Sequence, residues 1–321
     1  MKKILAFALA LALVLTAFTG CDSEKDESAE IEAIASSNDL YTAFLDDVLE
    51  ADAVRDMGFL APGKGLTLSE LENAVAKDLS SQYEEVLFAP MSTDYAFIDC
   101  GADGNPELLI KIVLSPNPDS FGDYTKYLIF KDIEGQLRCI DEEFSQYRTE
   151  STINEYGLIT TGGSNSAAEH CAYYYMINPD GEKIFLNSVR VIMGASKPQV
   201  DKYSVPSTLN SGLDEMEFSV NTDSPEAYTQ YVYNLTEMPP YDETTYDKYL
   251  EDNFFAFETI DGEPVMPSED DMYAYGNLGI KVYSMKDAQR IINEQRVKQG
   301  LTGKIENGGE PKFKNIADRE K

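Results

Sequence analysis

Three stretches of the chain repeat apolar residues with the period of an α-helix, at 39–50, from 67, and from 284 to about 299. The second and third open on Thr67 and Ser284, each followed three positions later by an acidic residue, which is the pattern of a capping box. The apolar stripes consist of Leu40, Phe44 and Val48, then Leu71, Val75 and Leu79, then Ala288, Ile291 and Ile292. Because an amphipathic helix buries its apolar stripe, we expect all three to pack on the core.

From residue 94 the pattern changes to apolar runs of strand length separated by short turns. Most of these turns contain Asp or Asn close to a Gly, the chemistry of tight reversals between strands. The predicted strands are 94–99, 107–114, 124–131, 136–140, 171–177, 183–189 and 254–260. The sequence therefore predicts an α+β fold, with an antiparallel β-meander core and a few helices packed on one side.

The segments between these elements are polar. Residues 145–168 make a long connection that includes Gly162-Gly163-Ser164, and this connection is either functional or a disordered surface excursion. Residues 196–225 are rich in Ser, Pro and Asn and indicate a subdomain boundary, while the charged residues 303–321 predict a frayed tail. The globular region is therefore expected over 39–302.

The first 21 residues have the layout of an export signal. Lys2 and Lys3 precede an apolar run from 4 to 18, and Thr19-Gly20 stands directly before Cys21. The arrangement resembles a bacterial lipoprotein signal, in which the Cys after the cleavage site is lipidated, although Phe18 stands where that pattern usually has Leu. The apolar run is too short for a comfortable transmembrane span.

This resemblance implies a signal peptide over 1–20 and a lipid, palmitate included, on Cys21. Residues 21–38 are small and acidic and predict a flexible tether between that lipid and the folded region. We therefore expect an extracytoplasmic protein at the cell surface, anchored to the cell membrane by its lipid.

Charge narrows the choice of partners. The 321 residues carry a formal charge of −31, which becomes −33 once Lys2 and Lys3 leave with the signal. Such a surface repels nucleic acid and anionic lipid headgroups, so nucleic acid is not expected as a partner and the membrane is reached only through Cys21. The excess carboxylate either keeps an exported protein soluble or forms an acidic recognition face, and it also suits divalent cations.

Three cysteines remain beside Cys21, namely Cys100, Cys139 and Cys171, so at most one disulfide can form among them. We expect them to be small buried residues on strands, with Cys139 and Cys171 as the pair to test for oxidation. There is no Cys-x-x-Cys, and His170 is the single histidine, which excludes a zinc site of familiar ligand pattern.

The strongest candidate for chemistry is the turn from Asp99 to Glu107, between two predicted strands. Asp99 and Asp103 would supply charge, the carbonyl of Asn105 a further oxygen, and Glu107 would close the far side, as in the calcium loop of an EF-hand. Gly104 permits the sharp reversal. This pattern makes Asp99, Asp103, Asn105 and Glu107 a candidate Ca²⁺ site, with Ca²⁺ as the one candidate cofactor.

The same turn resembles the Asp-x-Asp-x-Asp-Gly-x-x-Glu/Asp turns of calcium-binding β-hairpins, but Gly101 stands where that pattern has Asp or Asn. One metal ligand is therefore missing, and at the least this lowers the affinity for Ca²⁺. The alternative is that Asp-Gly-Asn-Pro is good turn chemistry, with the Asp side chains capping backbone amides.

A wider resemblance is to a group of uncharacterised Firmicutes surface lipoproteins, and it covers roughly residues 65–190. The segments that carry it are 95–99, 106–109, 154–159, 162–164 and 173–181. The resemblance implies a surface location and a β-rich fold, and no settled activity comes with it.

Enzyme signatures are sparse. His170 follows Glu169, but the chain has no Gly-x-Ser-x-Gly elbow and no phosphate-binding glycine loop. The tyrosine run at 173–175 either lines a sugar or peptide groove or packs across strands. We therefore expect a non-enzymatic binding module for a protein or glycan ligand. The alternatives are a surface hydrolase, with two carboxyl groups about 5 to 9.5 Å apart in a deep cleft, and a purely structural envelope lipoprotein.

Overall fold

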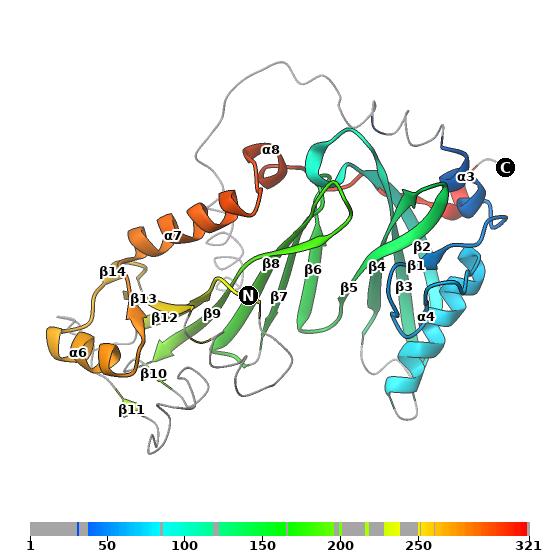
Figure 1. The fold of residues 1–321 in the computed structure, drawn as a ribbon. Helices are drawn as coiled ribbons and strands as arrows, with labels where there is room; N and C mark the ends of the chain where they lie inside the picture. Colours follow the sequence, from blue (N-terminus) through cyan, green and yellow to red (C-terminus); the bar gives the residue numbers. More distant parts are fainter. Residues whose placement is uncertain are drawn as a thin grey trace.

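The computed structural model describes residues 38–319 and Ile31, except for 84–85, 118–121, 165, 196–198, 201–215, 218–227, 238–249, 251 and 260. The predicted signal peptide lies outside the described residues, and so do the predicted tether, except Ile31 and Asn38, and most of the predicted boundary at 196–225. The described chain is α+β, with two sheets dominated by antiparallel pairing, which confirms the predicted fold class (Figure 1).

The first sheet has six strands in the order β1-β5-β4-β3-β2-β16. They are β1 (Asp52–Ala53), β2 (Leu87–Ile98), β3 (Glu107–Asn117), β4 (Tyr124–Ile133), β5 (Gln136–Ser145) and β16 (Lys314–Asn315). Strands β2 to β5 form an antiparallel meander, and the short β1 joins β5 in parallel. Alternate residues of β3 pack in two different hydrophobic clusters, one on each face of this sheet, which is why Leu108 to Leu114 form a nearly continuous apolar run.

Two helices cover one face of the first sheet, α3 (Asp39–Leu45) and α4 (Leu68–Gln82). The capping box that begins α4 is present, because the Thr67 amide donates to Oε2 of Glu70 at 3.0 Å. Helix α3 is shorter than the predicted 39–50. Asp47 adopts a φ of 61°, which ends the helix and leaves Val48 77% exposed rather than in the core.

The second sheet has the order β14-β13-β12-β9-β8-β7-β6, and β15 pairs with β13 in parallel. Its strands are β6 (Thr149–Ile153), β7 (Leu158–Ser164), β8 (Glu169–Ile177), β9 (Lys183–Ala195), β12 (Tyr228–Asn234), β13 (Asn253–Thr259), β14 (Pro264–Val265) and β15 (Lys281–Val282). Strands β10 (Gln199–Val200) and β11 (Met216–Glu217) pair only with each other among the described strands.

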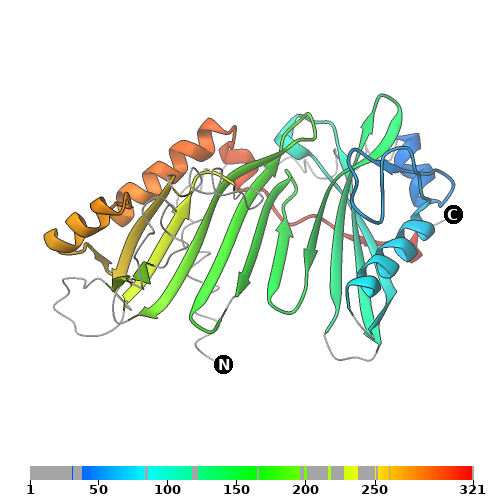
Figure 2. The ribbon, with the colours of Figure 1, turned by 60° about the horizontal axis from the view of Figure 1, so that its bottom comes forward.

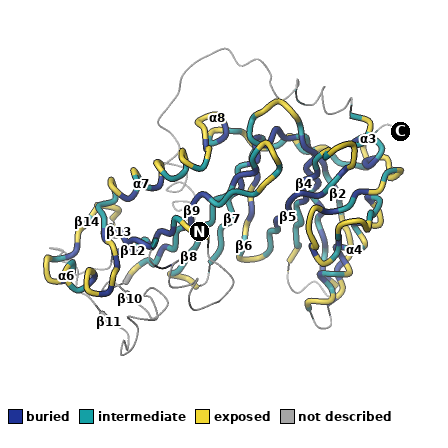
Figure 3. The backbone as a smooth tube through the Cα atoms, viewed as in Figure 1, coloured by how far each residue is buried: buried dark blue, intermediate teal, exposed yellow. Residues whose placement is uncertain are grey.

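Helices also cover the second sheet. They are α6 (Glu269–Asn277), α7 (Met285–Lys298) and α8 (Gly303–Glu306), with the 3-10 turns η1 (Cys100–Ala102) and η2 (Ile316–Asp318) elsewhere. Ala288 and Ile292 of α7 pack on β12 and β13, while the opposite side of the helix is exposed (Figure 3). As predicted, Ser284 caps α7 by accepting from the Asp287 amide at 3.1 Å.

Two predicted irregular segments are ordered. The connection predicted at 145–168 contains β6 and β7, in which Ile153 and Ile159 pair across the two strands and bury their side chains. The tail predicted at 303–321 forms α8, β16 and η2 up to residue 319, and Figure 2 shows it passing in red from the second sheet to the first. Backbone hydrogen bonds hold this segment: the Glu155 amide donates to the Gly309 carbonyl at 2.9 Å.

The two sheets diverge after the tight turn between β5 and β6, where Gln146 and Thr149 exchange two backbone hydrogen bonds of 2.7 Å. A buried polar network fills this junction. Lys183 contacts Asp141 and Glu143, and Glu143 accepts from the hydroxyls of Ser151 and Thr161 at 3.2 and 3.1 Å. The network therefore joins β5 of the first sheet to β6, β7 and β9 of the second.

A second junction is the contact of η1 with the β6–β7 and β8–β9 turns. Gly101 adopts a φ of 77°, and a Cβ there would lie 2.5 Å from the Pro179 ring. The Gly101 amide donates to the Tyr156 carbonyl at 3.1 Å. The close approach requires a residue without a side chain, which explains the glycine at this position.

Candidate functional site

The residues predicted to bind Ca²⁺ lie together in the turn between β2 and β3, but protein donors occupy their oxygens. Oδ1 of the buried Asp99 accepts from the Gly104 amide at 2.8 Å, and Oδ1 of Asp103 accepts from the Asn105 amide at 2.8 Å. Burial raises the pKa of Asp99. These are the contacts of the alternative interpretation, in which the turn's acids cap backbone amides.

Glu107 is fully buried, and both of its oxygens are engaged. Oε2 accepts from the Cys100 amide at 2.8 Å, and Oε1 is paired with the ammonium of Lys131. Burial raises the pKa of Glu107 to about 7, although Lys131 and the Cys100 amide act in the opposite direction. A cation would have to displace Lys131 to reach this carboxylate.

Within the described residues, no group of three or more His, Cys, Asp or Glu side chains has the arrangement of a metal site. In this conformation, Lys131 and backbone amides contact carboxylate oxygens that Ca²⁺ would need. Calcium binding by Asp99, Asp103, Asn105 and Glu107 stays a prediction that a binding measurement must test.

The three cysteines, Cys100, Cys139 and Cys171, are free, and none of them forms a disulfide with another described residue. Cys139 on β5 is buried on a strand as expected, Cys100 is buried but lies in the 3-10 turn η1 rather than on a strand, and Cys171 on β8 is only half-buried. Burial raises the pKa of all three thiols, which keeps them protonated and weakly reactive at neutral pH.

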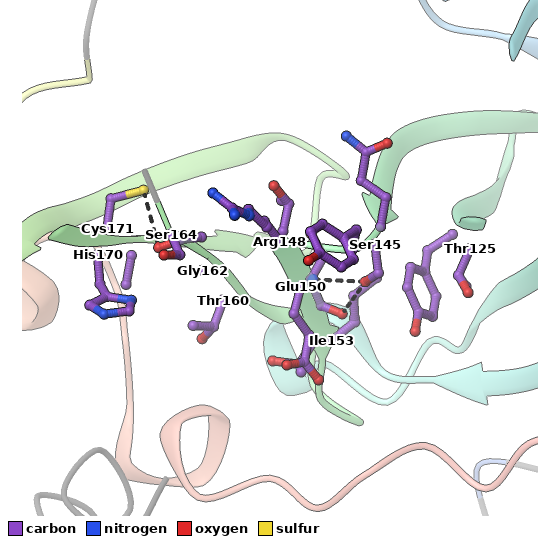
Figure 4. A pocket seen from close by; sticks show the side chains of 18 of the residues that line it. Thr125, Ser145, Arg148, Glu150, Ile153, Thr160, Gly162, Ser164, His170 and Cys171 are labelled. Atoms are coloured by element: carbon purple, nitrogen blue, oxygen red, sulfur yellow. Dashed lines mark hydrogen bonds between the residues drawn. The ribbon is translucent and has the colours of Figure 1, made fainter. Parts of the chain in front are cut away.

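A hollow with a volume of about 1010 Å³ lies beside the junction of the two sheets. Its floor comes from β6, β7, β8 and β9, its opposite wall from β3 and β4, and its border from the turn after β5 and the C-terminal segment at 310–313. Figure 4 shows these strands from close by, with the C-terminal segment passing opposite them. We call this space the hollow.

Strand register places the floor residues in rows that cross the sheet. One row is Glu150, Gly162, Ala172 and Val189, one is Thr152 and Thr160, and one is Ser164, His170 and Val191. Directly paired residues share a face, and residues two apart on a strand share it as well. The side chains of all three rows therefore belong to one face of the second sheet.

The middle row makes the floor deepest. Gly162 and Ala172 are cross-strand neighbours and carry almost no side chain between Glu150 and Val189. A Cβ at Gly162 would meet only the Cys171 carbonyl oxygen, at 3.7 Å, which is an ordinary contact. Gly162 is therefore not required by backbone strain, and its missing side chain contributes to the depth of the hollow.

The opposite wall combines rings and hydroxyls. Tyr127 and Thr125 of β4 line it, and the Lys111 ammonium lies 5.3 Å from the centroid of the Phe313 ring. At the rim, Tyr147 is 85% exposed on the turn between β5 and β6, and the Arg148 guanidinium lies 5.6 Å from its ring centroid. An exposed tyrosine beside a hollow is a ready contact surface for a ligand.

His170 and Cys171 both border the hollow but do not form a catalytic pair. They are consecutive on β8, and Figure 4 shows the imidazole of His170 on the side of Thr160 and the thiol of Cys171 on the opposite side of the strands. The Cys171 thiol points back to the Gly163 carbonyl, at 3.8 Å. The arrangement therefore offers no thiolate for the histidine to activate.

The tyrosine run at 173–175 is divided between the two faces of β8. Tyr173 and Tyr175 line a second hollow of about 490 Å³, beside the ion pairs of Lys183 with Glu143 and of Lys126 with Glu142. Tyr174 lies on the other face, with the Arg296 guanidinium 4.5 Å from its ring centroid. The run therefore contributes both to the lining of a hollow and to packing, and a sugar or peptide ligand for it stays a prediction.

Most residues of the hollow were missed as a site by sequence reasoning, because they belong to the segment interpreted as a loop. The available signal was the alternation in β6 and β7, where Thr152 and Thr160 lie next to the buried Ile153 and Ile159. Local sequence patterns do not show how the strands pair, and it is this pairing that brings β6 to β9 close to β4 and to residues 310–313.

Comparison of the chain with protein-family models, curated proteins and solved structures finds no match. None of the helices in the described part of the chain is long and apolar enough to span a membrane.

Proposed function

We propose that the protein is a lipid-anchored, extracytoplasmic binding module that holds its ligand in the hollow. The signal-like N-terminus and Cys21 support the location, and the acidic stretch 21–38 supplies the tether. The observation that carries the binding role is the hollow itself, at the upper end of the volumes typical of ligand pockets.

The polar lining supports binding more than catalysis. Three carboxyl groups border the hollow, and they come from separate segments: Asp123 precedes β4, Glu150 lies on β6, and Glu310 lies in the C-terminal segment. The raised carboxyl pKa values belong instead to Asp99 and Glu107, which lie in the turn between β2 and β3. The experiment must distinguish this binding module from two alternatives, namely a hydrolase acting on carbohydrate or peptidoglycan and a purely structural lipoprotein.

The experiment fills the hollow without disturbing the fold. Gly162→Tyr adds a ring where a Cβ meets only one atom within 4 Å, and Gly276→Tyr on α6 is the matched control, since nothing lies within 4 Å of its Cβ. The chain from residue 22 onward, which contains every described residue, is melted with the glycan and the peptide fractions of a bacterial cell-wall digest. We expect at least one fraction to raise the Tm of the wild type and of Gly276→Tyr but not of Gly162→Tyr.

Equal stabilisation of Gly162→Tyr, or none with either fraction, would overturn the binding role of the hollow. Steady release of reducing sugars or new amines from the digest would replace the module with the hydrolase. The anchor is tested in the full chain by metabolic labelling with palmitate, which Cys21→Ser should abolish; retained label would place the lipid elsewhere.

A further inference from the structure

Building on the proposed binding function, we infer that the ligand of the hollow is an uncharged carbohydrate chain, held by threonine hydroxyls on the floor and by aromatic rings at its border. Three features of the lining support this class: its charge balance, its unused hydroxyls and the placement of its rings.

The hollow is nearly neutral in a strongly acidic protein. Its fully charged lining residues are Lys111, Arg148, Asp123, Glu150 and Glu310. Two cations and three carboxylates give a net charge of −1, against −31 for the whole chain. A site for a cationic ligand would concentrate carboxylates, and a site for an anionic glycan would need an excess of Lys or Arg. The lining has neither a concentration of carboxylates nor an excess of Lys and Arg.

Hydroxyl groups dominate the polar lining, and nine of the lining residues carry one. The hydroxyls of Thr152 and Thr160 lie in one row of the floor and have no hydrogen-bond partner among the described residues. A hydroxyl both donates and accepts. It therefore matches the hydroxyls of a sugar, which also do both, and it leaves no charge to be desolvated.

Aromatic rings stand at the border of the same space. Tyr147 and Phe313 lie at the border, and Tyr127 lies on the opposite wall. The C–H faces of sugar rings are apolar and pack on aromatic faces, while the sugar's hydroxyls at the ring edge reach the threonines. With about 1010 Å³, the hollow exceeds what a single small sugar fills and suits several linked units.

The geometry favours a glycan over an extended peptide. Peptides usually join a sheet by adding a strand at its edge, where backbone donors and acceptors are exposed. The floor of the hollow is a sheet face, on which the backbone groups of β7 and β8 are already paired. At the edge strand β6, the Ser151 amide already donates to the Ser145 hydroxyl at 2.8 Å.

The test uses neutral hexasaccharides built from glucose, xylose, mannose and N-acetylglucosamine, titrated calorimetrically into the chain from residue 22 onward. We expect at least one to bind, with an affinity that changes less than about 2-fold between roughly 0.05 and 0.5 M NaCl, because no ion pair is involved. An anionic oligogalacturonate and a mixed peptide library serve as the charged and peptide probes.

Three variants locate the binding. Tyr147→Ala should weaken it about 10-fold and Thr160→Val, which removes only a hydroxyl, about 3- to 10-fold. Tyr273→Ala on α6 is the control, because Tyr273 is 75% exposed but does not line the hollow. Its affinity should equal that of the wild type, and all variants should keep the wild-type circular dichroism spectrum and melting cooperativity.

The outcomes separate this inference from the function on which it rests. If none of the neutral hexasaccharides binds, or if binding is unaffected by Tyr147→Ala and Thr160→Val, the carbohydrate inference is wrong. If the peptide library or oligogalacturonate binds instead and Gly162→Tyr blocks it, the hollow is still a binding site and only the ligand class fails. If Gly162→Tyr blocks nothing, both proposals fail together.

Discussion

Replacing Lys183 by Met should show how much the buried polar junction contributes to holding the two sheets together. Nζ of Lys183 lies 3.1 Å from Oδ2 of Asp141 and also contacts Glu143, and both carboxylates are buried. Burial lowers the pKa of Lys183, but the two carboxylates outweigh it and the net pKa is raised. The ammonium is therefore held charged by its partners, and methionine would fill a similar volume without the charge.

The magnitude follows from the geometry. An ion pair at 3.1 Å attracts by roughly 5 kcal/mol at an effective dielectric constant of about 20, and desolvation of the ions offsets part of this. Asp141 keeps the Arg55 guanidinium at 2.6 Å, and Glu143 keeps the Ser151 and Thr161 hydroxyls, so neither carboxylate loses every partner. We expect Lys183→Met to reduce the free energy of unfolding by about 3 kcal/mol, the low end for breaking a buried pair.

Urea unfolding at pH 7 measures this loss of stability. Arg290→Met is the control, because its ion pairs on α7 are exposed to solvent, which screens them, so this variant should lose far less stability than Lys183→Met. A Lys183→Met loss no larger than that of Arg290→Met would refute the reasoning.

Three further results are expected. Gly101→Ala should lower the free energy of unfolding by more than about 2 kcal/mol and Gly104→Ala by about 1 kcal/mol. Both glycines have φ near +80°, but only at Gly101 would a Cβ lie within 4 Å of another residue, Pro179. Equal losses in urea unfolding would show that the Pro179 contact relaxes freely. The free energy of unfolding should fall by up to about 3 kcal/mol between pH 5 and pH 8, because the pKa of Glu107 is raised to about 7 in the folded state, above its unfolded value, so that protonation favours the fold. Glu107→Gln should flatten this pH dependence, and an unchanged slope would assign it to other groups. Thermal melts in about 10 mM CaCl₂ and in MgCl₂ should show equal shifts in Tm, because Lys131 and backbone amides already contact the carboxylate oxygens of the turn. A Ca²⁺-specific shift that Asp103→Ala removes would restore the calcium interpretation.

Local chemistry was predictable wherever neighbouring residues decide the conformation. The caps at Thr67 and Ser284 set the starts of α4 and α7, and the hairpin between β4 and β5 turns at Gly135, as the sequence indicated. The α+β class follows from the same local signals, because elements with a single apolar face must pack in layers. The end of α3 was misjudged because Asp47 takes a left-handed conformation that the helical period does not reveal.

The hollow could not be predicted in the same way, because its parts are far apart in sequence. Its floor, its aromatic wall and the residue Phe313 come from β6 to β9, from β4 and from the C-terminal segment. Composition made the last segment look frayed, yet its backbone pairs with Glu155, 154 positions earlier than Gly309. Long-range pairing of this kind overrides local conformational propensity, and the propensities of neighbouring residues do not predict it.

The amino-acid sequence by itself determined where helices start, where hairpins turn and which apolar faces become buried, because caps, turns and periodicity act over a few residues. Only the tertiary structure decided that the acids of the predicted cation turn pair with Lys131 and backbone amides, and that Gly162 and Ala172 meet to deepen a hollow lined by hydroxyls. Those outcomes depend on which strands lie side by side and in which register, and a shift of one residue would have turned every such side chain to the other face.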